Sequence, residues 1–210
     1  MARYLDEVLV ATDDERIASV VRSFGGLVRM TRADHPTGTD RLAEIASAEN
    51  ASLFVNIQGD EPLIDPGAID AAVLAVSHDD DIAMGTLKRP MVDLDDLANP
   101  NVVKVVTNLL GDAIYFSRAA IPFIRDGHAD LSLYAKHIGV YVYRREFLLA
   151  YPDLSVGPLE LAERLEQLRA LENGYRIRVV PTDYESIGVD TPEDLERVNQ
   201  LFAAVGGLRA

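Results

Sequence analysis

Short apolar runs alternate with helix-like segments over the first sixty residues, and this alternation limits the folds open to the chain more than any other feature. The apolar runs lie at residues 7–11, 27–30 and 52–57. The segments between them place apolar side chains at helical spacing, and a polar loop at 31–41 precedes the second one. This β-α-β-loop-α-β order is typical of a parallel sheet with helices on both faces.

The second half of the chain breaks this rhythm. Residues 102–107 and 113–117 are both strand-like, and the tight turn Leu110-Gly111-Asp112 joins them, which predicts an antiparallel pair. Further strands are expected at 82–88, 134–143, 177–180 and 186–190, and further helices at 66–76, 145–151, 158–171 and from 192. We therefore expect a single α/β domain with a mixed, mostly parallel sheet and a small antiparallel excursion around 108–145.

Composition excludes several kinds of site and partner. The 210 residues include no cysteine, so disulfides and thiolate metal sites are ruled out. A net charge of −14 disfavours broad binding to nucleic acid or to an anionic membrane. The sequence has no apolar run near the roughly 20 residues of a membrane span and no signal-peptide pattern. We expect a cytoplasmic protein with no nucleic-acid or membrane partner.

Two aspartates follow expected strands. Asp60 lies in the turn Gln58-Gly59-Asp60-Glu61-Pro62, directly after the apolar run at 52–57. Ligands of open α/β sheets bind at the carboxyl ends of strands. Asp190 ends another expected strand, and two carboxylates with phosphate oxygens are a usual ligand set for Mg²⁺. Two simpler interpretations stay open from the residues alone: Gly, Asp and Pro are common in turns, and Asp190 could bond backbone amides at a helix start.

The loop at 31–41 could contact a nucleotide base through its hydroxyls and backbone amides. Its candidate residues are Thr31, Arg32, Thr37, Gly38, Thr39 and Arg41. The structural alternative is a surface loop that caps the next helix and carries solvated arginines.

Two further pairs of side chains could face a ligand. His137 and Tyr141 lie on one face of a strand with Gly139 between them, which leaves room for a ligand unless the rings only pack. Glu166 and Gln167 lie in a helix, where solvated side chains are the commoner outcome. Lys104, in an apolar strand, would need a partner if buried, although an edge strand would remove that need.

The chain resembles the 3-deoxy-manno-octulosonate cytidylyltransferases (CMP-Kdo synthetases). The similar stretches follow one another along nearly the whole chain, and they are Val10-Ala11-Thr12-Asp13, Met30-Thr31-Arg32-Ala33-Asp34-His35, Gly38-Thr39-Asp40-Arg41-Leu42-Ala43-Glu44, Val55-Asn56-Ile57-Gln58-Gly59-Asp60-Glu61-Pro62, Asn99-Pro100-Asn101-Val102-Val103-Lys104, Tyr115-Phe116-Ser117-Arg118, Lys136-His137-Ile138-Gly139-Val140-Tyr141, Leu165-Glu166-Gln167-Leu168-Arg169 and Gly188-Val189-Asp190-Thr191-Pro192-Glu193-Asp194-Leu195.

The resemblance implies a Rossmann-like nucleotide-diphospho-sugar transferase fold. It also implies transfer of CMP from CTP to 3-deoxy-D-manno-octulosonate (Kdo), with release of pyrophosphate, for lipopolysaccharide biosynthesis. Asp60 and Asp190 are then the catalytic residues and hold Mg²⁺, while the loop at 31–41 and Gln58 lie against the cytidine. His137, Tyr141, Glu166 and Gln167 line the Kdo pocket. The family is homodimeric, and residues 134–143 resemble a part that contributes to pairing.

The N-terminus departs from the family pattern. The family begins with a strand and a basic, glycine-containing loop around the triphosphate, whereas residues 1–4 here already correspond to the end of the helix after it. The resemblance therefore implies that this first strand and phosphate loop are missing. A start assigned too late in an ordinary enzyme is the favoured explanation. The other is a true short protein, a non-catalytic ligand-binding or dimerising fragment. A cytidylyltransferase for another acidic sugar is the nearest enzymatic alternative.

Overall fold

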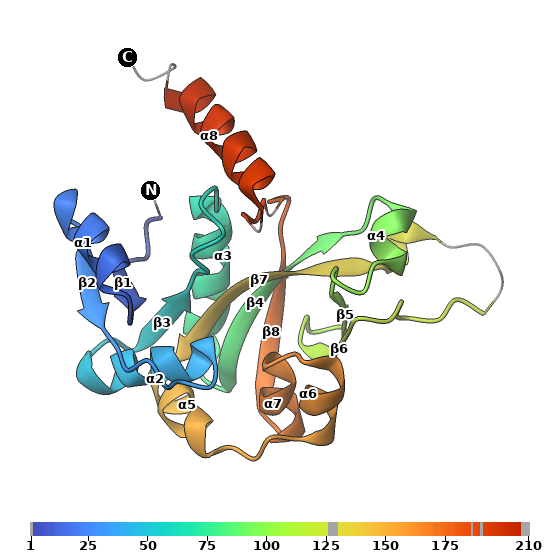
Figure 1. Cartoon of the computed structure of the whole chain (residues 1–210). Coiled ribbons are helices and arrows are strands. Elements are labelled where there is room, and N and C mark those ends of the chain that lie inside the picture. The colour runs from blue at the N-terminus through green and yellow to red at the C-terminus, as the bar shows by residue number, and fades with distance from the viewer. Residues whose placement is uncertain (1, 126–129, 186, 190, 207–210) are drawn as a thin grey trace.

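The structure is a computed structural model, and it describes residues 2–125, 130–185, 187–189 and 191–206, with side chains up to residue 203. It confirms the mixed α/β fold (Figure 1). The strands are β1 (Leu9–Thr12), β2 (Leu27–Met30), β3 (Leu53–Asn56), β4 (Ile82–Pro90), β5 (Lys104–Thr107), β6 (Ala113–Ser117), β7 (Ala135–Arg144) and β8 (Arg176–Pro181). The helices are α1 (Glu15–Ser23), α2 (Gly38–Ala48), α3 (Pro66–Ser77), α4 (Leu94–Ala98), α5 (Arg145–Ala150), α6 (Pro158–Glu163), α7 (Gln167–Glu172) and α8 (Pro192–Gly206), with 3₁₀ turns η1 (Leu131–Leu133) and η2 (Tyr151–Asp153).

The described strands form two sheets. Parallel strands β1 and β2 make one, and the others make a mixed sheet in the order β6-β5-β7-β4-β8, with β3 bonded to β7. β4 and β8 are parallel, whereas β7 is antiparallel to both β3 and β4. Within the described residues no ladder joins β3 to β1 or β2, so the parallel neighbours expected for β3 are wrong. The neighbour that β3 does have is the antiparallel strand β7, whose ten residues lie between β3 and β4.

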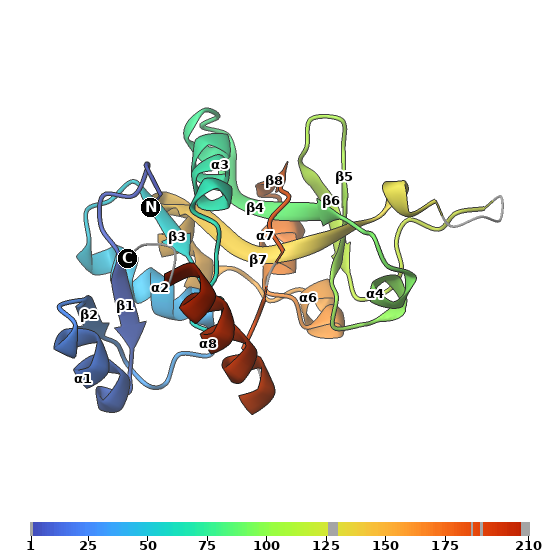
Figure 2. The ribbon, with the colours of Figure 1, turned by 90° about the horizontal axis from the view of Figure 1, so that it is seen from above.

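Helices cover both faces of the mixed sheet. In Figure 1, α3 lies above the sheet and α2, α5, α6 and α7 lie below it. The buried side chains of α3 pack against Leu87, Val140 and Val142 on one face. On the other face, α2, α5 and α7 bury a second cluster around Met84 and Phe116. Figure 2 shows β1, β2 and α1 at one end of the molecule and the antiparallel excursion at the opposite end.

The single helix expected at 158–171 is wrong, because the chain breaks between α6 and α7. Arg164 ends α6 with φ of 54°, the left-handed region, and its N–H donates to the Glu160 carbonyl at 2.8 Å. Leu165 and Leu168 are buried on either side of the break. The apolar spacing therefore continues through the break, and spacing alone cannot reveal it.

The strand expected at 186–190 is also wrong for its described part, because residues 187–189 are irregular. The N–H of Val189 donates instead to the Asp60 carbonyl at 2.9 Å. The expected start of the last helix is confirmed, since Thr191 and Asp194 cap α8 through reciprocal bonds to each other's N–H. No helix within the described ranges is long and apolar enough to cross a membrane.

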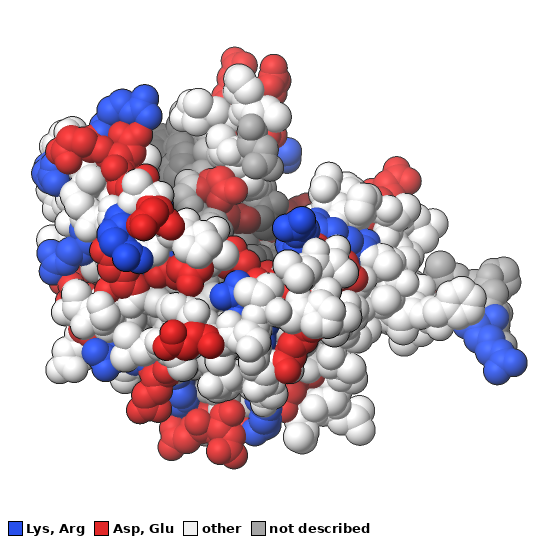
Figure 3. Space-filling model, turned by 60° about the horizontal axis from the view of Figure 1, so that its bottom comes forward, with Lys and Arg blue, Asp and Glu red and all other residues white. Residues whose placement is uncertain are grey.

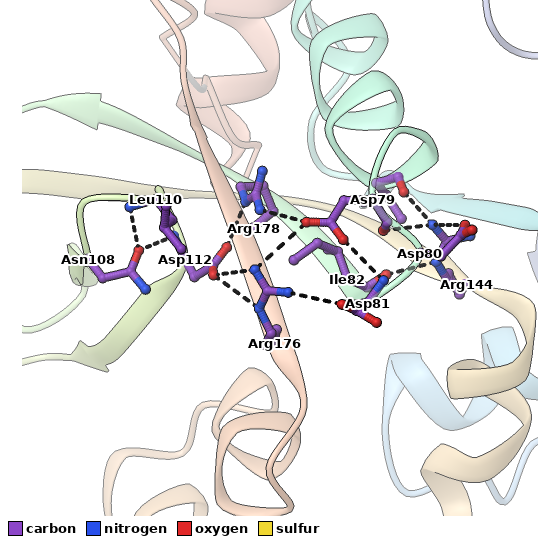
Figure 4. Close-up of polar contacts among 11 residues, drawn as sticks. Asp79, Asp80, Asp81, Ile82, Asn108, Leu110, Asp112, Arg144, Arg176 and Arg178 are labelled. Atoms are coloured by element: carbon purple, nitrogen blue, oxygen red, sulfur yellow. Dashed lines mark hydrogen bonds and ion pairs between the residues drawn. The ribbon is translucent and has the colours of Figure 1, made fainter.

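The excursion begins with the antiparallel pair that the tight turn predicts, β5 and β6. Ion pairs fasten its turn to β8 (Figure 4). The buried Asp112 carboxylate accepts from Arg178 at 2.7 Å and from Arg176 at 2.8 Å. Arg178 also reaches Asp79, at the end of α3, at 3.1 Å. Burial would raise the pKa of Asp112, but the bonds from both guanidinium groups outweigh this effect and lower it.

Candidate active site

Asp60 lies at the end of β3, where the sequence predicts a ligand site. Its exposed side chain lies within a turn after β3 that is closed by a bond from the Glu61 N–H to the Gln58 carbonyl at 3.1 Å. Among the described residues its carboxylate has neither a hydrogen-bond nor an ion-pair partner. The bond from Val189 brings a segment 129 residues later in the chain beside this turn. Asp190, the second expected metal ligand, lies outside the described residues.

The loop at 31–41 is held in place mainly by Arg41. Its guanidinium donates to the Thr31 hydroxyl at 2.6 Å and pairs with Asp13 at 2.8 Å, so Arg41 is not a solvated arginine. Thr37 caps α2 by accepting from the Asp40 N–H at 3.1 Å. The loop therefore does cap the next helix, through Thr37. Its contact with a nucleotide base stays a prediction.

Three other candidates for nucleotide contact are accessible. Arg32 and Gln58 are exposed, and the space where a Cβ of Gly38 would point is open within 4 Å. Thr39, by contrast, is buried, and its hydroxyl donates to the Glu166 carboxylate at 2.7 Å. Thr39 thus joins the loop expected at the nucleotide to a residue expected at the sugar.

The four residues expected at the sugar come together in the structure. The Tyr141 hydroxyl donates to Gln167 Oε1 at 3.4 Å, and the rings of His137 and Tyr141 are 5.4 Å apart. Glu166 precedes Gln167 in the chain, and its carboxylate accepts a hydrogen bond from Thr39. A Cβ at Gly139 would meet nothing within 4 Å, so the room expected between His137 and Tyr141 is present.

His137 is neutral at physiological pH. Burial lowers its pKa to about 3, and its Nε2 lies 2.8 Å from the Thr86 hydroxyl. That hydroxyl donates its one proton to the carbonyl of Val140 at 2.8 Å. His137 Nε2 must therefore carry the proton shared with Thr86, and Nδ1 is left as an acceptor.

Gln167 contributes an unused donor. Its side-chain nitrogen is buried and has no partner among the described residues. Since Gln167 Oε1 already accepts from Tyr141, both N–H groups of the amide are available. Burial also raises the pKa of Tyr141 well above its usual value, so its hydroxyl keeps its proton as a donor. An unpartnered buried amide is costly for stability, which favours a role in binding an oxygen-rich ligand.

Arg118 was not among the site residues expected from the sequence. Its guanidinium donates to three backbone carbonyls, of Glu163 at 2.7 Å, Pro100 at 3.0 Å and Arg164 at 3.4 Å. No carboxylate of the described chain pairs with this cation at ion-pair distance. The available signal was its place at the end of Tyr115-Phe116-Ser117-Arg118, one residue after a strand whose Phe116 ring packs on His137 at 5.1 Å.

Comparisons with known proteins agree with one another. Residues 2–177 match the model of a family described as cytidylyltransferase. A 3-deoxy-manno-octulosonate cytidylyltransferase of Solibacter usitatus is 67% identical over 97% of the chain and 81% of its own length. The enzyme of that name from Geobacter metallireducens is 57% identical over 94% of the chain and 81% of its own length.

Solved structures agree with this result. The structure of CMP:2-keto-3-deoxy-manno-octonic acid synthetase complexed with CTP is 41% identical, with a TM-score of 0.91 over 97% of this chain and 83% of that one. The 4-diphosphocytidyl-2C-methyl-D-erythritol synthase of Anaerococcus prevotii is 14% identical with a TM-score of 0.60, over 95% of this chain and 82% of that one, a likeness of fold alone. The chain therefore belongs to the cytidylyltransferase family and, within it, to the 3-deoxy-manno-octulosonate cytidylyltransferases.

Proposed function

We propose that the protein transfers CMP from CTP to Kdo and releases pyrophosphate. The single observation that carries this proposal is the 67% identity, over 97% of the chain, with a curated 3-deoxy-manno-octulosonate cytidylyltransferase. The cluster of His137, Tyr141 and Gln167 supports the choice of sugar, because it offers a neutral acceptor and amide donors suited to a polyhydroxy acid. The product is an activated sugar for lipopolysaccharide assembly.

The reaction is an in-line attack of a sugar hydroxyl on the α-phosphorus of CTP. The residues of this chain act by binding and orientation, which make the attack effectively unimolecular. The loop at 31–41 and Gln58 hold the cytidine, and the four sugar residues hold Kdo. Arg118, whose guanidinium is fixed by carbonyls and forms no ion pair within bonding distance in the described chain, binds the sugar carboxylate. His137 accepts a hydroxyl hydrogen without acting as a base, since its pKa of about 3 is far below neutral pH.

We also propose that Asp60 and Asp190 hold Mg²⁺. An exposed carboxylate at the end of a strand, beside Val189 and without a partner in the described chain, is of the ligand type that Mg²⁺ prefers with water and phosphate. The ion would neutralise charge on the phosphates of CTP. Among the described residues, which do not include Asp190, no group of three or more His, Asp or Glu side chains could hold a metal ion.

A homodimer that pairs through the excursion is a third proposal. Some of its large apolar side chains are exposed, namely Leu109, Leu110, Ile114, Phe123 and Leu133. In Figure 3 the arm that projects from the body is mostly white near the body and carries a blue basic group at its end. Exposed apolar surface of this kind favours association with a partner. The cytoplasmic location expected from the sequence stays a prediction.

The function is tested by measuring pyrophosphate release from CTP with Kdo and Mg²⁺. Turnover is expected with Kdo and not with sialic acid, and Asp60→Asn should lower kcat by about 100-fold or more if Asp60 holds the ion. The matched control is Asp80→Asn, a fully exposed aspartate far from β3 in the sequence, which should not change kcat. Faster turnover with sialic acid would mean that the substrate is another acidic sugar and not Kdo. If neither sugar gives pyrophosphate release, the chain is a ligand-binding protein and not an enzyme.

The dimer is tested by light scattering after size-exclusion chromatography. Wild-type protein is expected to run at twice the monomer mass, and Phe123→Asp to run as a monomer because a charge would be buried at the interface. The control Val92→Asp replaces another exposed apolar side chain, outside the excursion, and should stay dimeric. A monomeric wild-type protein at micromolar concentration would contradict the proposal.

A further inference from the structure

Lys104 is a lysine in an unexpected place. It is fully buried in β5, with Ser117 of β6 and Lys136 of β7 as its sheet neighbours, so the edge-strand alternative does not apply. None of the described carboxylates lies within ion-pair distance of its ammonium group. Nζ donates instead to the carbonyls of Val102 at 2.6 Å and Asn99 at 2.9 Å.

Stability of the core does not explain this residue. Burial disfavours the charged form and lowers the pKa of Lys104. Attraction to Glu163 and Asp96 opposes this effect only in part, and repulsion from Arg118 adds to it. Replacing buried charges by apolar groups of similar volume is often neutral or stabilising in proteins. An unbranched apolar side chain would therefore fill the space as well. What the ammonium group adds is the pair of hydrogen bonds to the Asn99 and Val102 carbonyls.

These two carbonyls lie on either side of Pro100. The Pro100 carbonyl accepts from Nη1 of Arg118 at 3.0 Å. By holding Asn99 and Val102, Lys104 fixes the backbone that presents this third carbonyl to the guanidinium. Of the three carbonyls around Arg118, the other two belong to the break between α6 and α7.

The break between α6 and α7 is held by hydrogen bonds that do not involve Lys104. The Glu163 carboxylate accepts from the Ser117 hydroxyl at 2.6 Å and from the Arg118 N–H at 2.9 Å. The Glu163 carbonyl accepts from Arg118 Nε at 2.7 Å. Loss of Lys104 would thus leave the guanidinium attached on one side and released on the side of Pro100.

We propose that Lys104 is a positioning residue that orients the Arg118 guanidinium towards the carboxylate of the acidic sugar. The inference rests on the proposed function, in which Arg118 binds that carboxylate. Lys104 does not touch substrate. It acts through the loop 99–103 and specifically on sugar binding, because the described contacts of Arg118 include none with the loop at 31–41.

The test is a double-mutant cycle of Lys104→Met and Arg118→Met on the full chain, with Kdo and CTP varied separately. Lys104→Met is expected to raise the KM for Kdo about tenfold, the scale of one charge-assisted hydrogen bond, with the KM for CTP unchanged. In the Arg118→Met background, Lys104→Met should change nothing further, because its effect passes through Arg118. Cooperative thermal unfolding of Lys104→Met checks that the variant is folded, so that a change in KM reports on the site.

The control is Lys88→Met, which removes another partly buried lysine, on β4, whose Nζ bonds only the Thr107 hydroxyl among the described residues. It should leave both KM values unchanged. An unchanged KM for Kdo in Lys104→Met, additive effects in the cycle, or a variant that fails to fold would each overturn the proposal. If wild-type protein releases no pyrophosphate with Kdo and calorimetry detects no Kdo binding, the proposed function is overturned instead.

Discussion

His137 shows how one partly buried side chain couples stability to pH. The unfolded chain binds a proton at a histidine near pH 6.5, whereas the folded protein does so only near pH 3. The unfolded state therefore binds more protons throughout this window, and His137 makes the protein less stable as the pH falls from 6.5 towards 3.

We expect wild-type protein to lose about 1.4 kcal/mol of unfolding free energy per pH unit below 6.5 through His137 alone. His137→Gln should lack this part of the pH dependence. Urea unfolding at pH 7 and pH 5 measures the difference, and parallel losses in both proteins would contradict the assigned pKa.

Replacing Gln167 should affect the affinity for Kdo more than the free energy of unfolding. Gln167→Leu removes a buried amide nitrogen that has no partner among the described residues, but it also takes away the acceptor of the Tyr141 hydroxyl, so the free energy of unfolding should stay within about 1 kcal/mol of the wild-type value. The affinity for Kdo should fall about tenfold or more, because two donors are lost. Thermal unfolding and calorimetry with Kdo check the two effects. Lower stability with unchanged affinity would assign Gln167 to the core rather than to the sugar.

At the scale of elements, the turn between β5 and β6 depends on one aspartate. Asp112→Ala would leave Arg176 and Arg178 without their nearest carboxylate, and we expect a loss of about 2–4 kcal/mol in unfolding free energy. Asp80→Ala is the matched control in the same network, because its side chain is 98% exposed beside Arg144 and such a pair contributes little. Chemical denaturation of the two variants measures the loss of unfolding free energy in each. Equal losses would mean that the turn is held by other contacts.

At the scale of the whole molecule, the two sheets should differ in local stability. No ladder joins β1 or β2 to the mixed sheet in the described chain, and the apolar side chains of Ile17, Val20 and Phe24 on or next to α1 are exposed. Few buried contacts mean a low free energy of local opening. Amide hydrogens of residues 9–30 should therefore exchange faster than those of β4 and β7. Equal protection of both sheets by mass spectrometry would contradict this expectation.

Local sequence determined much of the fold. The turn Leu110-Gly111-Asp112 fixed the antiparallel hairpin, because a short connection leaves two adjacent strands no other pairing. The spacing from Ile69 to Val76 identified the buried face of α3, and Thr191 with Pro192 marked the start of α8. The resemblance rests on motifs from Thr12 to Asp194, and it identified the family. It also predicted that four side chains line one pocket, and the structure places these four close together.

Only the tertiary structure decided what depends on residues far apart in the chain. The position of β7 between β3 and β4 and the break at Arg164 follow from packing and long-range hydrogen bonds, which local spacing does not encode. The neutral His137 depends on burial, and the fixed Arg118 depends on carbonyls from Pro100 and Glu163. The sequence by itself determined which residue types and elements are present. The tertiary structure decided which charged groups are desolvated and which groups they contact, because desolvation depends on neighbours in space.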